Sequence, residues 1–348
     1  MDYCCNTGGK YHGTDFVQFL VEHEATKPGY DRLRKPLINS HAIGYMDGDS
    51  SRTRVSQMQD VKSNIDPDVA AGFGYEWSTF QQGEAELSRA DRAAIFESYF
   101  HIFPWSELPA DATGLDVGCG SGRWSAMVAP RVGHLHLLDA SEDALAVARQ
   151  NLAGTPNVSF HFASVDKIPL ADGSLDFAFS LGVLHHVPDT VAAIRSIAAK
   201  LKGGAPFLIY LYYALDNRGW WYRAIWRASD VLRRVISRLP GKMRFLISQI
   251  IAICIYWPLA RFAALVERAG FSPSAIPLES YRHREFYVMR TDAYDRFCTK
   301  LEQRFTRRQI ESMLVDAGFG EIRFSDTVPY WCAVGRKLPP PPTEPPRE

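Results

Sequence analysis

The sequence predicts an α/β domain with a mostly parallel sheet and helices on both of its faces. From residue 113 onward, short apolar runs alternate with longer stretches that have helical periodicity. This alternation favours strand–helix–strand units, whose strands pair in parallel. The first run leads into GLDVGCGSGRW (114–124), which contains four glycines. Glycines directly behind a strand are typical of a turn whose backbone approaches a ligand.

The composition is that of a globular protein without a dominant charge. The 348 residues allow one large decorated domain or two smaller ones, 39 Lys and Arg balance 39 Asp and Glu, and 46% of residues are hydrophobic. These values exclude a disordered chain and disfavour a protein that coats nucleic acid. The six cysteines form no CxxC pair or zinc-type spacing, so we expect neither disulfides nor a metal site. The N-terminus does not resemble a secretory signal, and we expect a cytoplasmic protein.

The elements begin with an N-terminal extension, residues 1–86, that contains a short helix at Asp15–Glu24 and a polar loop at 44–52. The core follows at residues 87–213, and Ser88 is expected to cap its first helix. The core is then predicted to contain five strands and two further helices. The strands are GLDVG (114–118), HLHLLD (134–139), VSFHF (158–162), LDFAFSL (175–181) and APFLIYLYY (205–213), and the helices are SEDALAVARQNL (141–152) and TVAAIRSIAAKL (190–201).

A helical insertion, residues 214–300, is predicted after the fifth strand, because about ninety residues is far longer than an ordinary connection. The core resumes at residues 301–338 with one helix and two final strands. These are TRRQIESMLVDAGF (306–319), EIRFSDT (321–327) and YWCAVGRK (330–337). A proline-rich tail, residues 339–348, is predicted to be disordered.

The insertion begins with a basic amphipathic helix. Residues 218–244 contain eight basic residues and the single acid Asp230, and the helix is expected to end before Pro240. We expect its arginines on one face, and Ile225, Leu232, Ile236 and Leu239 on another. The apolar run that follows, 245–257, is too short to span a membrane, which predicts a buried or interfacial helix. A solvated basic face over a packed lid is favoured, and peripheral membrane contact through 218–257 stays open.

The glycine loop and the acids near it predict a nucleoside site. Asp139 ends the second strand about twenty residues past the glycines, where a carboxylate can accept hydrogen bonds from ribose hydroxyls. Arg123 occupies the place where dinucleotide-binding loops need a third small residue. Asp116, inside the strand before the loop, favours a cationic ligand over a pyrophosphate. We therefore expect a positively charged nucleoside cofactor.

These residues occur in the order of a known family. Residues 113–212 resemble a class I S-adenosylmethionine-dependent methyltransferase of the small-molecule type, through DVGCGSG (116–122), Asp139 and SVDKIPLADGSLDFAFSLGVLHHVPD (164–189). The resemblance implies a Rossmann-like, seven-stranded sheet and S-adenosyl-L-methionine as cofactor. LKGGAP (201–206) departs from the family's commoner LKPGG at the turn before the fifth strand.

The resemblance also implies which residues bind the cofactor. Asp116 would orient a water or the amino group, Asp139 would hold the ribose, and Asp166 would accept from the adenine amino group. The full implied set is Asp116, Gly118, Cys119, Gly120, Gly122, Asp139, Ala140, Val165, Asp166, Ser180, Leu181 and Gly182. The aromatic stretch GFGYEWSTF (72–80) resembles a segment that closes over the cofactor in some members, and core packing is the alternative.

An acceptor with a hydroxyl group needs a base, whereas an amine need only arrive neutral. The candidates for this base are His185 and His186, behind the fourth strand. Tyr212, at the end of the fifth, is a further catalytic candidate, whose hydroxyl is expected to orient a polar acceptor. The residues expected to contact the acceptor are Tyr213, Trp220, Trp221, His283 and Tyr287.

We expect methyl transfer to a small hydrophobic acceptor, with O-methylation favoured over N-methylation. The alternatives are a peripheral lipid or quinone methyltransferase, an RNA methyltransferase and a non-catalytic scaffold. A DNA substrate is disfavoured because the chain lacks the amino-methylating and Pro-Cys motifs of the DNA enzymes. Arg123 and the absence of a YxxxK pair argue against a nicotinamide-dependent oxidoreductase. The sequence gives no prediction of the oligomeric state.

Overall fold

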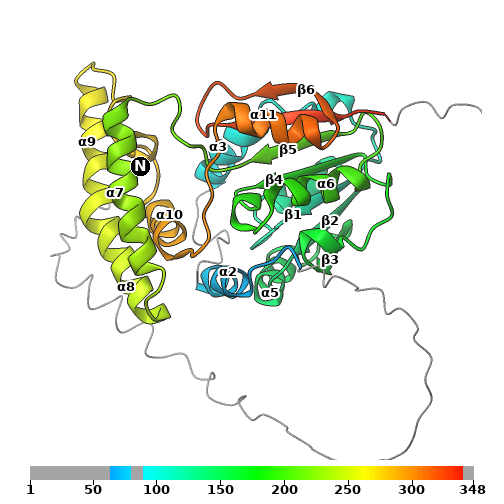
Figure 1. Cartoon of the computed structure of the whole chain (residues 1–348), viewed down its shortest axis with the longest axis horizontal. Coiled ribbons are helices and arrows are strands. Elements are labelled where there is room, and N and C mark those ends of the chain that lie inside the picture. Colours follow the sequence, from blue (N-terminus) through cyan, green and yellow to red (C-terminus); the bar gives the residue numbers. More distant parts are fainter. Residues whose placement is uncertain (1–62, 80–88, 340–348) are drawn as a thin grey trace, which may run out of the picture. The chain divides into compact units, whose positions relative to one another are not determined.

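The computed structural model describes residues 63–79 and 89–339, all of which belong to one compact unit, Asp60–Glu348 (Figure 1). The helix predicted at Asp15–Glu24, the loop at 44–52 and the cap at Ser88 lie outside the described residues. The proline-rich tail also lies outside them, apart from Pro339.

A seven-stranded mixed sheet forms the centre of the unit, in the spatial order β3-β2-β1-β4-β5-β7-β6. The strands are β1 (Thr113–Val117), β2 (His134–Asp139), β3 (Val158–Phe162), β4 (Phe177–Leu181), β5 (Pro206–Tyr210), β6 (Phe319–Phe324) and β7 (Cys332–Lys337). β1 to β5 are parallel, and β7 runs antiparallel to both of its neighbours. The predicted fold, with its mostly parallel sheet, is confirmed.

The helices are α2 (Pro67–Thr79), α3 (Arg89–Phe100), α4 (Ser125–Val128), α5 (Glu142–Asn151), α6 (Thr190–Lys200), α7 (Trp220–Ile236), α8 (Gly241–Ile251), α9 (Trp257–Arg268), α10 (Phe286–Cys298) and α11 (Arg307–Asp316). Local sequence fixes where several of them begin. Ser141 and Asp189 accept the backbone N–H groups of Ala144 and Ala192, and Thr306 forms a capping box with Gln309.

The sheet is buried on both faces, so its strands alternate their side chains between two apolar clusters. α6 and α11 cover one face, where Leu115 and Ile209 are buried. α3, α4 and α5 cover the other face, where Leu137 and Leu208 are buried. Burial on both faces explains why the strand sequences are apolar runs.

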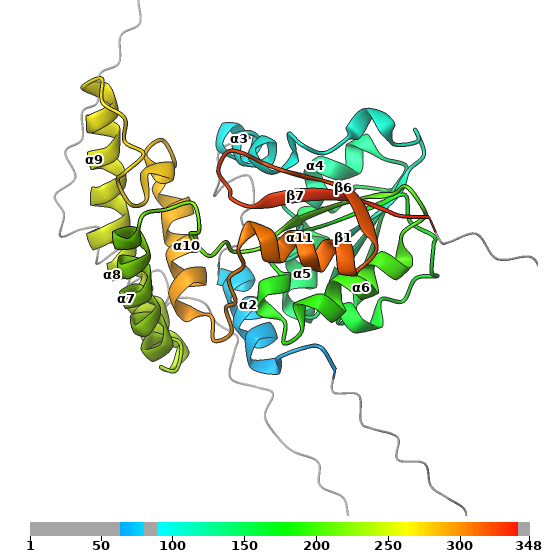
Figure 2. The same ribbon diagram turned by 45° about the horizontal axis from the view of Figure 1, so that its top comes forward.

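The insertion between β5 and α11 consists of α7 to α10, as predicted (Figure 1). It has an apolar cluster of its own, which includes Ile236, Ala252, Met289 and Ala293. α10 packs against α7 and α8 and lies between them and the sheet in both views (Figure 2).

The apolar run at 245–257 is part of a longer helix than expected. A π-helical turn at Ala252–Tyr256 joins α8 and α9 into one helix of 28 residues, Gly241–Arg268. By length and composition this helix could cross a membrane, and 39% of its most apolar window is buried inside the protein. The expectation of a buried or interfacial helix concerned residues 245–257 alone, and the helix that contains them is longer. The run continues through Pro258 because a proline is tolerated in the first turn of a helical segment.

The close approach of β1 and β4 requires a residue without a side chain at Gly114. A Cβ at this position would lie 2.0 Å from the ring of Phe177, which is fully buried. We predict that Gly114→Ala lowers the free energy of unfolding by about 1–3 kcal/mol, because the ring has no room to move. Urea denaturation measures this change.

Gly72→Ala is the matched control, because a Cβ at Gly72 meets no atom within 4 Å and the residue lies inside α2. Alanine in a helix interior is favoured by roughly 0.5–1 kcal/mol over glycine, so this variant should be unchanged or more stable. Equal stability of the two variants would contradict the packing described for β1 and β4.

Candidate functional site

A cavity of about 1240 Å³ extends from the carboxyl ends of the parallel strands to the helical insertion. Its walls come from the glycine loop, the ends of β2, β4 and β5, the helices α2 and α3, and the insertion. In open α/β sheets, ligands bind beyond the carboxyl ends of the strands. We call the part of the cavity beside the glycine loop and Asp139 the cofactor arm. We call the part that is lined by α7, α10 and the π-helical turn the acceptor arm.

The cofactor arm is built around the glycine loop. Gly118, Gly120 and Gly122 have φ angles of 75°, 54° and 74°, a conformation that favours glycine. A Cβ at Gly118 would also lie 2.4 Å from Val183. The loop is held by the carbonyl of Leu138, which accepts from the N–H groups of Gly118 and Cys119 at 2.7 and 3.1 Å.

Asp139 connects the loop to the next helix. Its Oδ2 accepts from the N–H of Gly120 at 2.9 Å, and its Oδ1 accepts from the N–H of Ser141 at 2.9 Å. Burial raises the pKa of Asp139, and these backbone hydrogen bonds act against that rise. Because Asp139 also lines the cavity, its carboxylate can accept from a bound ligand.

Seven of the twelve predicted cofactor residues line the cavity, namely Gly118, Cys119, Asp139, Ala140, Val165, Leu181 and Gly182. The other five, Asp116, Gly120, Gly122, Asp166 and Ser180, do not line it. No ligand contact is present to test these assignments, which stay predictions.

Three of the five have hydrogen-bond partners that explain their positions behind the wall. Asp116 accepts from the Ser125 hydroxyl at 2.6 Å, and burial raises its pKa to about 7. The Ser180 hydroxyl donates to the carbonyl of Val117 at 3.0 Å, across the β1–β4 pair. Asp166 accepts from Ser164, which does line the cavity, and from Ser63.

The aromatic stretch ahead of the core contributes to the cavity wall through α2. Phe73 lines the cavity, and its ring centroid lies 4.9 Å from that of His186. Asn64 anchors this segment, because its side chain donates to the carbonyl of Asp189 at 2.7 Å and accepts from its N–H at 2.8 Å. Residues 64–73 thus close one side of the cavity.

The two histidines behind β4 have different surroundings. His185 is fully buried, does not line the cavity, and has no hydrogen bond at either ring nitrogen. Burial lowers its pKa, and its ring stacks on Tyr212 at 3.8 Å between centroids. His185 is therefore separated from the cavity by Tyr212 and the wall, and its role as a base stays a prediction.

His186 and Tyr212, the other two catalytic candidates, line the cavity. The Nδ1–H of His186 donates to the carbonyl of Leu301 at 2.6 Å, and this bond assigns the tautomer. Its Nε2 lies 3.8 Å from Asp295. The Tyr212 hydroxyl donates to Asp295, and burial raises the pKa of Tyr212 well above its usual value. Tyr212 is therefore a hydrogen-bond donor at neutral pH.

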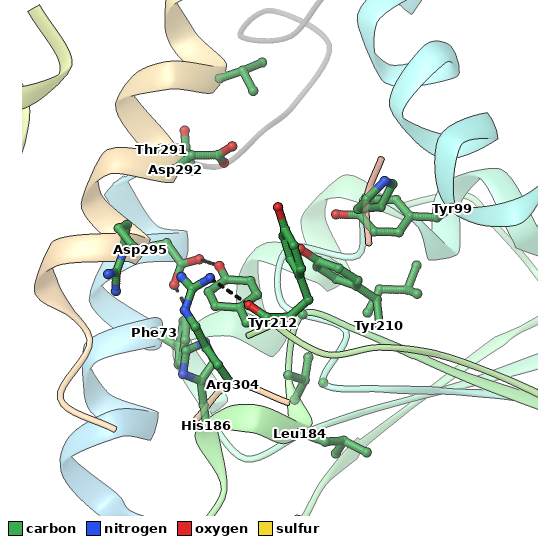
Figure 3. Close-up of a pocket in the computed structure, with 18 of the residues that line it drawn as sticks. Phe73, Tyr99, Leu184, His186, Tyr210, Tyr212, Thr291, Asp292, Asp295 and Arg304 are labelled. Carbon is green, nitrogen blue, oxygen red and sulfur yellow. Dashed lines mark hydrogen bonds and ion pairs between the residues drawn. The ribbon is translucent and has the colours of Figure 1, made fainter. Parts of the chain in front are cut away.

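Sequence reasoning missed two acids on α10 that line the acceptor arm, Asp292 and Asp295. Figure 3 shows them projecting from α10, with Tyr99 and Tyr210 on the other side of the cavity. The Tyr281 hydroxyl donates to Asp292 at 2.6 Å. Burial raises the pKa of Asp292 to about 6. No motif marks either acid, and only the docking of α10 brings them to the site.

Most of the residues predicted to bind the acceptor lie elsewhere. Tyr213 lines the cavity, whereas Trp220, Trp221, His283 and Tyr287 do not. Trp220 is 76% exposed, and the Nε2 of His283 pairs with Glu267 at 2.5 Å. Tyr287 packs against the apolar cluster of the insertion, whereas Val288, Thr291 and Asp292 on the same helix line the cavity.

Comparison with known proteins agrees with this site. Residues 115–204, which run from β1 to the turn before β5, match a family described as a methyltransferase domain. The match covers the glycine loop, Asp139 and the segment behind β4.

Three relatives illustrate the similarity. The chain is 32% identical over 127 residues to a ubiquinone biosynthesis O-methyltransferase from Hydrogenovibrio crunogenus, which covers 35% of this chain and 51% of the relative. It is 33% identical over 103 residues to phosphoethanolamine N-methyltransferase 2 from Caenorhabditis elegans, covering 29% and 24%. It is 26% identical over 180 residues to a demethylmenaquinone methyltransferase from Listeria monocytogenes, covering 45% and 69%.

The chain thus spans about half the length of the first relative. The part that matches the family, residues 115–204, contains the glycine loop and reaches from β1 to β4 and α6. The chain therefore contains a class I S-adenosylmethionine-dependent methyltransferase domain.

Proposed function

We propose that the protein transfers a methyl group from S-adenosylmethionine to a hydroxyl group of a small hydrophobic acceptor. The observation that carries this proposal is the continuity of the cavity, in which the glycine loop and the acceptor arm share one space. The cofactor supplies an electrophilic methyl group, and the protein supplies alignment and exclusion of water.

The residues present fit this cofactor. The wall at Gly118 has no room for a side chain, so the backbone of the loop can approach a ligand closely. Asp139 lies at the end of β2 with its carboxylate in the wall, where ribose hydroxyls can donate to it. Val165 offers an apolar surface beside Ser164.

The acceptor arm is lined by aromatic and aliphatic side chains, which favours a hydrophobic acceptor with few polar groups. These side chains are Tyr99, Tyr210, Tyr256, Ile251, Leu259 and Val288. The ubiquinone and menaquinone relatives, by their names, support an acceptor of this kind. The phosphoethanolamine relative keeps N-methylation as the second candidate.

Asp292 is the best-placed candidate for the base that a hydroxyl acceptor requires. It lines the acceptor arm and is held by Tyr281, which leaves its other oxygen able to accept a proton. Burial is the main cause of its raised pKa, and Asp295 adds to the rise, whereas Tyr281, Arg123 and Arg284 act against it. A base with a pKa near 6 is largely ionised at neutral pH.

The first test is cofactor binding by Asp139→Ala, measured by calorimetric titration with S-adenosylmethionine and S-adenosylhomocysteine. The variant should bind both about 1–3 kcal/mol more weakly, because it loses a charge-assisted hydrogen-bond acceptor. NAD should not bind to either protein.

Asp172→Ala is the control, since Asp172 is an exposed acid in a surface pair with Lys200. Thermal unfolding of both variants separates a loss of binding from a loss of folding. Unchanged affinity in folded Asp139→Ala would remove Asp139 from the cofactor site.

The second test is the pH dependence of methyl transfer to an alkylated catechol, followed as S-adenosylhomocysteine formation. The rate should rise with pH through about 6, because Asp292 is protonated below its pKa and accepts a proton only above it. Asp292→Asn should lose about 10²–10⁴-fold in rate together with this dependence.

Tyr281→Phe tests whether Asp292 acts as the base or has only a structural role. Its hydroxyl lowers the pKa of Asp292, so its removal should move the rising limb to higher pH while transfer continues. If Asp292→Asn keeps both the rate of methyl transfer and the rise of that rate with pH near 6, Asp292 is not the base.

A further inference from the structure

The outer surface of the insertion is unusually apolar. Twenty large hydrophobic side chains are exposed among the described residues, and fifteen of them lie between residues 220 and 271. They are Trp220, Trp221, Ile225, Val231, Leu232, Val235, Met243, Leu246, Ile250, Ile253, Ile255, Trp257, Phe262, Leu265 and Phe271. We call these fifteen residues the apolar face. A patch of this extent marks an interaction surface.

On α7 the apolar half of the helix is not the buried half. Trp221, Ile225, Leu232 and Val235 recur at helical spacing and are exposed, at 40%, 53%, 45% and 57%. The side chains turned inward include Asp230, Arg233 and Ile236. The sequence pattern thus identified an amphipathic helix, but tertiary packing turned a charged pair inward and left the apolar stripe outside.

The long helix Gly241–Arg268 carries a second exposed stripe, spaced three to five residues apart. It consists of Met243, Leu246, Ile250, Ile253, Trp257, Phe262 and Leu265. The opposite side of the helix is held by the protein, because Gln249 accepts from Arg290 at 2.5 Å and Arg261 donates to the carbonyl of Arg282 at 3.0 Å. A helix bound on one side and apolar on the other suits a position in the plane of a bilayer surface.

The charge around the apolar face is positive. Residues 218–266 contain nine Arg and Lys and one acid, Asp230. Asp230 is buried and pairs with Arg233 and Arg234 at 2.8 Å each. Arg223, Arg227 and Lys242 are exposed beside the apolar stripes. Basic side chains at the edge of an apolar surface are complementary to anionic lipid headgroups.

The acceptor arm reaches the apolar face. Ile225 and Leu232 on α7 and Ile255 in the π-helical turn line the cavity and are also exposed, Ile255 at 44%. The cavity wall therefore includes side chains of both helices that carry the apolar stripes. Exposed apolar side chains thus border the cavity at this place.

We propose that the apolar face rests on an anionic lipid bilayer, and that the acceptor is a lipid whose apolar chain extends through the opening between α7 and the π-helical turn. The proposed docking to a bilayer rests only on the apolar face and its basic neighbours, and does not depend on the proposed function. The lipid acceptor rests on the proposed function and extends it to a substrate class. The protein lies on the bilayer and does not span it, because the inner side of Gly241–Arg268 stays bound to the insertion.

Flotation of the full-length protein with vesicles tests the docking. It should bind phosphatidylcholine vesicles containing phosphatidylglycerol, bind vesicles of phosphatidylcholine alone more weakly, and be released by alkaline carbonate. The double variant Leu246→Glu/Ile250→Glu should bind at least about tenfold more weakly, because charges replace apolar side chains at the contact. Arg223→Glu/Arg227→Glu should lose the preference for phosphatidylglycerol.

The matched controls are Val315→Glu and Arg195→Glu, on exposed positions of α11 and α6, and both should bind like the unmodified protein. Thermal unfolding and cofactor titration confirm that each variant is folded. Equal flotation of Leu246→Glu/Ile250→Glu and the unmodified protein overturns the docking. The docking is also overturned if the unmodified protein is a dimer that these substitutions dissociate, because the apolar face would then bind a second copy of the chain. Binding to vesicles that resists alkaline carbonate overturns it too, because the helix would then span the bilayer.

The entry route is tested with catechol and 4-pentadecylcatechol in phosphatidylglycerol vesicles. Ile225→Trp/Leu232→Trp narrows the opening and keeps the face apolar, so the ratio of transfer to the long-chain acceptor over transfer to catechol should fall about tenfold or more. Equal loss for both acceptors, or no loss for either, overturns the route. If the unmodified protein binds cofactor and methylates neither, the lipid acceptor fails together with the proposed function, and flotation still decides the docking.

Discussion

The hydrogen bond from Tyr212 to Asp295 joins the end of the sheet to the helical insertion, and both residues line the cavity between the two. Tyr212 follows β5, and Asp295 lies on α10, 83 residues later. His186 approaches the same carboxylate from behind β4. Three separate segments thus meet at one partly buried carboxylate, and α10 is fixed as a wall of the acceptor arm.

A second set of buried charges supports the same junction. Glu302 accepts from Arg296 at 2.7 Å and from Arg304 at 2.8 Å, with only 1% of its side chain exposed. Burial alone would raise the pKa of Glu302, but Arg304 and Arg296 outweigh burial and lower it. Removing one partner from such a cluster leaves an uncompensated buried charge, which makes the arrangement costly to disturb.

The insertion is the part of the protein that departs from simple burial rules. It buries Arg233, which donates to Asp230 and to the carbonyl of Thr299 at 2.9 Å, and exposes Ile225 and Leu232. A soluble lid of this size would be expected to do the reverse. The lid therefore has two functional surfaces in our interpretation, one toward the acceptor arm and one toward a lipid bilayer.

The sequence by itself determined the sheet and the cofactor loop, because both depend on short-range patterns. Apolar runs alternating with capped helices specify strands and crossovers. The glycines at 118 and 120 indicate the positive φ angles that the loop adopts there. Only the tertiary structure decided which polar groups meet in the acceptor arm. Asp292 lies far along the chain from the loop, and its helix gives no signal of which face turns inward. His185 and His186 are adjacent in sequence, yet packing buries the first behind Tyr212 and leaves the second in the cavity wall.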